Sequence, residues 1–345
     1  MTDTSLRQDV GIPLSFGAGT ALLPDHQILS IAEIAASQMQ GRIDPGTVRP
    51  LKKPTTEARV ADATSVYYVD GTFPSENCVL IVSPQDFPDT VEESAAAALL
   101  ARSLLGWDLG SFICAPRLVG RAHGRSYAVY PRAKAFSQNR YLRLAQKRLV
   151  TPAILHWLAG TLRLSAVERS GLAELDARFV RPLQNLAGDA DLPQAVRDLA
   201  LASVKAVQEG RVRTATCLQH GDFWFGNIMF EGNFLAWAAP FRKQLRVIDW
   251  GSSRADGYPG IDVVRYLMST FGPGPYAARA VATYCQRANL TATDLSVSCL
   301  AALGRLALEL NGFPKQNFTA MVRNVYDFLE RIRALEGLQG VEGRP

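Results

Sequence analysis

Three side chains that could do chemistry through their oxygen atoms, Asp222, Asn227 and Asp249, occur in two short segments of the sequence. The first segment reads HGDFWFGNI (220–228), and the second reads VIDWG (247–251). Carboxylate and amide oxygens suit Mg²⁺, which commonly takes one or two protein ligands together with phosphate oxygens. Asn227 and Asp249 are therefore predicted metal ligands. Asp222 lies beyond them and is free to accept a proton.

Two short strands must bring these side chains together. The patterns from Ile228 to Phe230 and from Leu245 to Ile248 each predict a strand, with a loop between them. If the strands pair, Asn227 and Asp249 arrive at neighbouring strand ends. Phosphoryl transfer needs little more than this, because the enzyme mainly positions the groups and neutralises their charge.

These motifs resemble those of the aminoglycoside phosphotransferase and choline kinase-like family, which is related to the protein kinases. The loop matches the family's H-G-D-x-x-x-x-N pattern, and the next strand matches its apolar-apolar-D-W pattern. The downstream Gly257, Pro259 and Asp262 match G-x-P-x-x-D. By this resemblance Asp222 orients the acceptor hydroxyl and receives its proton. Asn227 and Asp249 would hold magnesium.

The resemblance also implies supporting roles around this site. His220 would pin the catalytic loop, and Asp262 would hydrogen-bond the loop's backbone from the start of the next helix. Gly251 would support the site from the D-W-G segment. The segment from Tyr130 to Arg132 would be the hinge whose backbone meets the adenine edge of ATP.

Two features depart from the family's pattern. Kinase-like enzymes usually carry a phosphate-binding lysine on the third strand, paired with a glutamate on the following helix. Ile81 stands where that lysine is expected, and no lysine occurs between Lys53 and Lys134. Glu93 or its neighbour Glu92 remains as the glutamate.

The expected nucleotide loop is poor in glycine and rich in charge. Lys53 is taken as the cation that contacts the nucleotide, with Lys52 and Arg59 as alternatives, although the residues themselves favour the interpretation that all three are solvated surface charges. The loop offers threonine hydroxyls but no glycine for close backbone approach. A donor other than ATP, such as GTP, stays open.

The order of predicted elements indicates an α+β, two-lobed protein kinase-like fold. Residues 1–24 form an N-terminal arm, 25–131 a nucleotide-binding lobe with an antiparallel sheet and one main helix, and 132–345 a mostly helical lobe. The apolar patterns predict helices at 25–39, 89–105, 152–164, 193–207, 261–269, 274–286, 293–310 and 318–335, and small-lobe strands at 48–51, 65–69, 78–82, 117–120 and 126–130.

Composition excludes several function classes. The 345 residues carry a net charge of +5, but basic and acidic residues are interspersed, which argues against nucleic-acid binding. No apolar run reaches the roughly 18 residues that span a bilayer, so neither a membrane partner nor a location outside the cytoplasm is expected. The five cysteines lack metal-ligand spacing and are predicted to be buried reduced thiols.

The sequence therefore predicts a phosphotransferase that uses Mg and ATP, or another nucleoside triphosphate, to modify a hydroxyl of a small molecule. An antibiotic, sugar, nucleoside or amino alcohol fits better than a polycationic sugar, because acids and bases are mixed in the C-terminal helices. The alternatives are an inactive kinase-like binding protein and, less favoured, hydrolysis by paired carboxylates. Either a monomer or a homodimer is compatible with the sequence.

Overall fold

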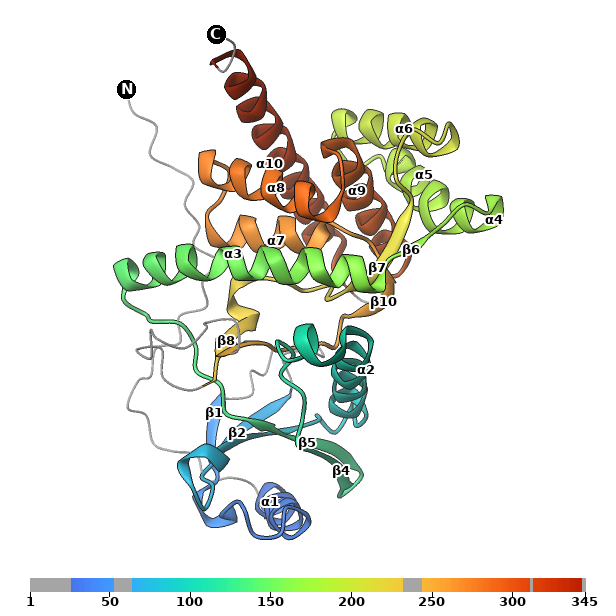
Figure 1. Ribbon diagram of the computed structural model, residues 1–345. Coiled ribbons are helices and arrows are strands. Elements are labelled where there is room, and N and C mark those ends of the chain that lie inside the picture. Colours follow the sequence, from blue (N-terminus) through green and yellow to red (C-terminus); the bar gives the residue numbers. More distant parts are fainter. Residues whose placement is uncertain (1–25, 53–63, 232–243, 311–312, 343–345) are drawn as a thin grey trace, which may run out of the picture.

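The chain is described by a computed structural model over residues 26–52, 64–231, 244–310 and 313–342. Figure 1 shows a sheet and two helices at the bottom, most of the other helices at the top, and the short strand β8 between them. The predicted N-terminal arm, Lys53 and Arg59 lie outside the described residues. No described helix is both long and apolar enough to cross a membrane.

The lower part is built on a five-stranded antiparallel sheet in the order β1-β2-β3-β5-β4. Its elements are α1 (His26–Gln38), β1 (Arg49–Lys52), β2 (Ser65–Val69), β3 (Cys78–Val82), α2 (Thr90–Gly110), β4 (Leu118–Ala122) and β5 (Arg125–Pro131). Alternating residues of β3 face opposite sides of the sheet. Leu80 packs in the core that includes α1, whereas Ile81 packs with Val91 and Ala95 of α2.

The upper part is mainly helical. Its helices are α3 (Arg140–Ser165), α4 (Leu172–Leu175), a π-helix (Asp176–Val180), α5 (Arg181–Gly188), α6 (Gln194–Gln208), α7 (Ile261–Thr270), α8 (Pro275–Ala288), α9 (Ala292–Leu308) and α10 (Lys315–Glu342). A small sheet β10-β7-β6 crosses it, made of β6 (Val167–Glu168), β7 (Ala215–Gln219) and β10 (Arg254–Gly257). The predicted α+β fold with a helical C-terminal part is confirmed.

The sequence-based boundaries are wrong at α3. That helix was expected to begin at Pro152 but begins at Arg140, so the proline lies inside it. A proline within a helix removes the hydrogen bond to the carbonyl four residues earlier. The hydroxyl of Tyr276 donates to that carbonyl, on Arg148, at 3.4 Å. A side chain from α8 thus compensates for the missing donor.

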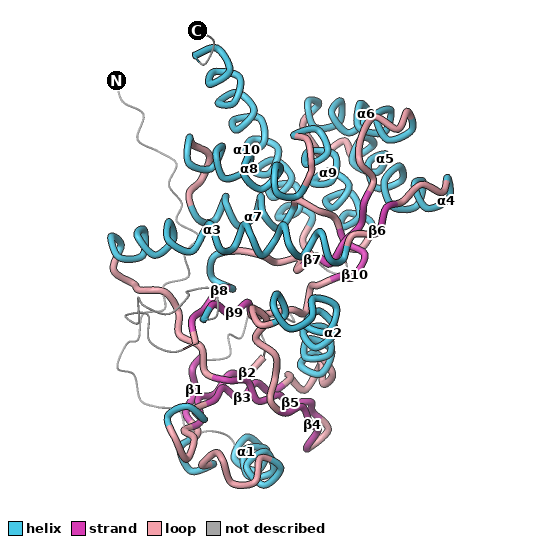
Figure 2. Tube along the Cα trace, viewed as in Figure 1, coloured by secondary structure: helices cyan, strands magenta, loops and turns pink. Residues whose placement is uncertain are grey.

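A two-stranded hairpin joins the two parts of the molecule. It consists of β8 (Ile228–Phe230) and β9 (Leu245–Val247), which pair in an antiparallel register. The backbone of Lys134 donates to Phe230 at 2.6 Å, and that of Cys114 donates to Val247 at 2.9 Å. The hairpin is therefore bonded both to the segment that follows β5 and to the loop between α2 and β4, and Figure 2 shows β8 and β9 between the lower and the upper part.

The main core lies in the upper part and surrounds the segment that follows β7. Trp157 of α3 stacks on Phe223 at 5.6 Å between ring centroids and meets Trp250 edge-on at 6.3 Å. The indole N–H of Trp157 donates to the backbone of Leu109, at the end of α2, at 3.0 Å. The five cysteines are free and buried, as predicted.

Candidate active site

The loop that follows β7 is held by a buried carboxylate. Asp262, in the first turn of α7, accepts the backbone N–H of His220 at 2.7 Å and that of Gly221 at 3.0 Å. Burial raises the pKa of Asp262 above its ordinary value, although the two N–H donors favour its charged form. Gly221 has φ +83°, and a Cβ added there would lie 2.3 Å from the carbonyl oxygen of Ser252. Only glycine fits this turn.

The ring of His220 ties the same loop to β9. Its Nε2 lies 2.9 Å from the carbonyl oxygen of Ile248, and its Nδ1 accepts the backbone N–H of Asp222 at 3.3 Å. These two partners require a neutral imidazole protonated at Nε2, because a carbonyl only accepts and an N–H only donates. The ring also packs against Trp250, with centroids 4.7 Å apart. His220 therefore has a structural position behind the loop.

Asn227 and Asp222 are brought together by a hydrogen bond across the loop. The Asn227 amide nitrogen donates to the backbone carbonyl of Asp222 at 2.9 Å and lies 3.4 Å from its Oδ2. Since this bond occupies the nitrogen, the amide oxygen of Asn227 is the atom left to bind a cation. The side chain of Asn227 is buried, so its orientation is fixed before any ligand arrives.

Asp249 joins this cluster through its neighbour in the sequence. The backbone N–H of Ile248 donates to the carbonyl of Asn227 at 3.0 Å, which places Asp249 just beyond the paired ends of β8 and β9. Asp249 has φ +66°, a left-handed conformation that costs a non-glycine residue free energy and is frequent at functional sites. Asp222 and Asn227 are thus hydrogen-bonded to each other, and Asp249 directly follows a residue that is bonded to Asn227.

The donor set at this hairpin fits a magnesium ion better than a transition metal. In the described part of the chain, no group of three His, Cys, Asp or Glu side chains could hold a metal. Asn227 and Asp249 offer an amide and a carboxylate oxygen, and Mg²⁺ is commonly held by one or two protein ligands with phosphate oxygens completing the shell.

Arg265 is a site residue that the motif analysis missed. It lies on α7, and its guanidinium donates to the carbonyl of Gly221 at 2.5 Å and forms an ion pair with Asp222 Oδ1. Its position three residues after Asp262 was the available signal, since residues three apart share one face of a helix. Both side chains therefore point at the catalytic loop.

The role predicted for Glu93 stays a prediction. Glu93 is exposed on α2, and Glu92 pairs with Arg121 at 2.8 Å. The side chain of α2 that lies beside the D-W-G segment is Ser94, whose Oγ would be 3.6 Å from a Cβ added to Gly251. The helix phase explains the difference, because one residue along a helix is a rotation of about 100°. In the described part of the chain, Ile81 stands where the lysine was expected, and both Glu92 and Glu93 are exposed.

Three predicted site residues remain, and the structure describes two of them, Tyr130 and Gly251. Tyr130 pairs with Val79 inside β5, so the connection to the upper part begins beyond Pro131. Burial raises the pKa of Tyr130, and the negative charges of Cys114 and Asp249 add to this. Gly251 has room for a Cβ. Lys53 lies outside the described residues.

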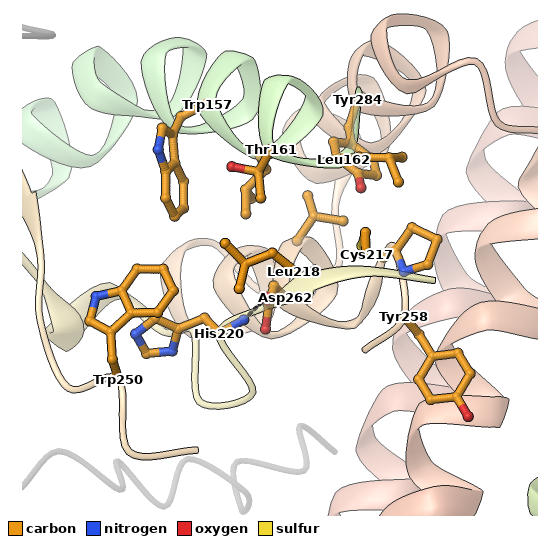
Figure 3. A pocket seen from close by; sticks show the side chains of 14 residues that line it. Trp157, Thr161, Leu162, Cys217, Leu218, His220, Trp250, Tyr258, Asp262 and Tyr284 are labelled. Atoms are coloured by element: carbon orange, nitrogen blue, oxygen red, sulfur yellow. Dashed lines mark hydrogen bonds between the residues drawn. The ribbon is translucent and has the colours of Figure 1, made fainter. Parts of the chain in front are cut away.

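A small cavity lies behind the catalytic loop. Figure 3 shows Trp157, Thr161 and Leu162 of α3 facing Leu218, His220 and Trp250 across it. Its volume is about 20 Å³, room for a single water molecule. Thr161 Oγ1 is buried there without a hydrogen-bond partner among the described residues. This space is too small for an acceptor molecule.

The sequence profile of the phosphotransferase enzyme family matches residues 61–295, more than half of the chain. The chain therefore belongs to the phosphotransferase enzyme family. No curated protein matches it.

Solved structures of aminoglycoside phosphotransferases are similar to this chain at low sequence identity. A thermostable variant of APH(4)-Ia, in a ternary complex with AMP-PNP and hygromycin B, aligns with a TM-score of 0.50 at 13% identity, covering 89% of this chain and 97% of that one. Spectinomycin phosphotransferase APH(9)-Ia, with ADP and spectinomycin, aligns with a TM-score of 0.44 at 13% identity, covering 89% and 98%. The GDP and kanamycin complex of APH(2")-IIia gives 0.44 at 14% identity, covering 89% and 99%. The likeness to APH(4)-Ia confirms the kinase-like fold.

Proposed function

We propose that this protein transfers the γ-phosphoryl group of a nucleoside triphosphate, ATP in the first instance, to a hydroxyl of a small molecule. The observation that carries the proposal is that the hydrogen bond between Asn227 and Asp222 and the backbone bond from Ile248 to Asn227 bring Asp222, Asn227 and Asp249 to the same end of the hairpin. Membership of the phosphotransferase enzyme family supports it. The solved structures named above were obtained with nucleotides and small-molecule substrates.

The chain's own residues divide the work of the reaction. Asp222 orients the acceptor hydroxyl and takes its proton as the oxygen forms a bond to the γ-phosphorus. The bond from that phosphorus to the bridging oxygen breaks, and the nucleoside diphosphate leaves. Asn227 and Asp249 would hold magnesium, which neutralises phosphate charge when bound. His220 and Asp262 keep the loop in place through the contacts already described.

The nucleotide would lie against the five-stranded sheet of residues 25–131, with the C-terminal part, 132–345, supplying the catalytic loop. The connection after β5 is the segment whose backbone would meet the adenine edge. The Arg132 N–H donates to Asn77, and the Lys134 N–H donates to Phe230. Within the described residues, the backbone of Ala133 makes no hydrogen bond, which leaves its N–H and C=O for the base.

The acceptor is proposed to be neutral or only weakly cationic. A polyamine sugar needs carboxylates that are not already paired with cations. In the segment after the D-W-G motif, Asp256 is paired with Arg178 and Arg305, and Glu309 with Arg254 and Arg305. An antibiotic, sugar, nucleoside or amino alcohol with few amino groups fits these paired charges better.

Phosphate transfer from Mg-ATP across a broad panel of hydroxylated acceptors tests the proposal. Wild-type protein should give a phosphorylated product with at least one acceptor, and Asp222→Asn should reduce kcat by about 10³-fold or more, because the proton acceptor is lost. The control is Asp198→Asn, since Asp198 is an exposed residue of α6. Equal activity of wild type and Asp222→Asn would exclude the assignment.

A kinase-like binding protein without turnover is the second candidate. It is favoured by Ile81, which stands where the usual lysine is expected, and by the exposed position of Glu93 on α2. Such a protein would bind nucleotide independently of magnesium. Thermal-shift titration with ATP, with and without magnesium, separates the two, since only the enzyme should show stabilisation that depends on the metal.

A further inference from the structure

Arg265 makes contacts that no family motif assigns. Its guanidinium donates to the backbone carbonyl of Gly221 at 2.5 Å and to Oδ1 of Asp222. The other carboxylate oxygen, Oδ2, lies 3.4 Å from the amide nitrogen of Asn227. Arg265 and Asp222 are both partly buried, with side-chain exposures of 27% and 36%. One side chain thus contacts two consecutive residues of the catalytic loop.

We infer that Arg265 is a positioning residue that fixes the Asp222 carboxylate for catalysis, an inference that rests on the proposed function. The guanidinium is planar, and its forked donors bind two acceptors in a defined geometry. By holding Gly221 and Oδ1 together, it fixes the rotation of the carboxylate about its side-chain bonds. Oδ2 then remains directed toward the acceptor hydroxyl and the Asn227 side of the site.

Asp262 and Arg265 hold different parts of the same loop, and this division supports the inference. Asp262, one turn earlier on α7, holds the backbone N–H groups of His220 and Gly221. Asp262 therefore fixes the backbone of the loop, whereas Arg265 is the described residue that contacts a terminal oxygen of Asp222 through a charged donor. Without Arg265 the loop would lose its contact at the carbonyl of Gly221, and the carboxylate of Asp222 would sample other rotamers.

The chain contains a matched arginine for comparison. Arg213 has a side-chain exposure of 28%, pairs with Glu168 at 2.6 Å and donates to the backbone carbonyl of Ala288 at 3.1 Å. It therefore resembles Arg265 in burial and in its pattern of one carboxylate and backbone carbonyls. Arg213 lies just before β7, away from the catalytic loop. Its replacement therefore shows how much the loss of such an arginine affects the fold without touching the site.

The experiment compares Arg265→Met, Arg265→Lys and Arg213→Met in the full chain, with Mg-ATP and an acceptor found in the panel. Arg265→Met should lower kcat by about 10²-fold, the loss expected when a reacting group is misplaced, with the KM for ATP changed less than about twofold. Arg265→Lys should recover part of kcat, because lysine keeps the charge but not the fork. Arg213→Met should keep the wild-type kcat.

The double variant Asp222→Asn/Arg265→Met should be no slower than Asp222→Asn, since residues that act as a unit are not additive. Guanidinium ion, at concentrations that leave the urea midpoint unchanged, should partly restore an Arg265→Ala variant. Wild-type kcat in Arg265→Met, or additive losses in the double variant, would overturn the inference.

Hydrogen exchange of the peptide spanning residues 219–227 separates this inference from the proposed function. Arg265→Met should speed exchange in this peptide, whereas Arg213→Met should not. If wild type shows no transfer but the exchange result holds, the proposed function fails and the contact between Arg265 and the loop stands. If transfer requires Asp222 but neither kcat nor the exchange of this peptide changes when Arg265 is replaced, the inference alone fails.

Discussion

Replacing Asp262 by alanine should loosen the catalytic loop before it affects any other part of the fold. The carboxylate is buried and accepts the N–H groups of His220 and Gly221 at 2.7 and 3.0 Å. Each buried donor left without a partner costs about 1–3 kcal/mol. Two such donors predict a loss of about 2–6 kcal/mol in the free energy of unfolding, a large share of the roughly 5–15 kcal/mol of a typical domain.

The control for this change is another buried aspartate with the same bonding pattern. Asp294 caps α9 and accepts the backbone N–H groups of Arg213 at 2.7 Å and Thr291 at 2.8 Å. Asp294→Ala should lower the urea midpoint by a comparable amount. Only Asp262→Ala, however, should expose the loop, because only its carboxylate bonds residues that carry the proposed chemistry.

The assay is hydrogen exchange of the peptide spanning residues 219–227, measured alongside urea unfolding and phosphate transfer. Asp262→Ala should accelerate exchange of this peptide and reduce kcat at temperatures where the protein is still folded. Asp294→Ala should change neither when compared at equal global stability. Unchanged loop exchange in Asp262→Ala would refute the reasoning, whatever the stability result.

Three further changes test other parts of the site. Asp249→Asn should raise the magnesium concentration for half-maximal activity by about tenfold or more with an unchanged urea midpoint, as a metal titration can measure. Gly221→Ala should abolish transfer and destabilise the protein by at least about 1–3 kcal/mol in urea unfolding, because its Cβ would lie 2.3 Å from a backbone oxygen at positive φ. Burial opposes ionisation of Asp256, but Arg305 and Arg178 outweigh it and hold its pKa below the ordinary value. Its stabilising contribution is therefore present above the ordinary carboxyl pKa and lost as the pH falls through the depressed folded pKa, so acid titration of Asp256→Asn should show a smaller loss of stability than wild type.

The catalytic hairpin could be predicted from the sequence because its signals are local. The apolar runs at Ile228 and Leu245 each end at a polar residue, and pairing them places Asn227 opposite Ile248, next to Asp249. Most of the five-stranded sheet was predictable for the same reason, since β2, β3 and β5 have apolar patterns, whereas β1 (Arg49–Lys52) has a single aliphatic residue between its charged ends. Only the order of the strands needed the folded structure.

Two of the strands that were missed depend on contacts between distant residues. Strand β6 has only two residues, and it exists because Val167 pairs with Thr216. Strand β10 is similarly defined by Arg254 facing Gln219. Neither segment has enough apolar residues to signal a strand. Arg265 was missed for a related reason: its partner lies 43 residues earlier, so only the folded chain shows the pair.

The surroundings of Ile81, which stands where a lysine was expected, bear on the exposed position of Glu93. Ile81 packs beside Val91, Ala95 and Ala128 on the α2 side of the sheet. A lysine there would bring an ammonium group to an apolar surface, where a charge is tolerated only with a partner. The partner would have to come from the face of α2 on which Ser94 lies, because that face approaches Gly251. A strand that carries isoleucine at this position therefore needs no carboxylate on that face of α2 to neutralise a buried ammonium group.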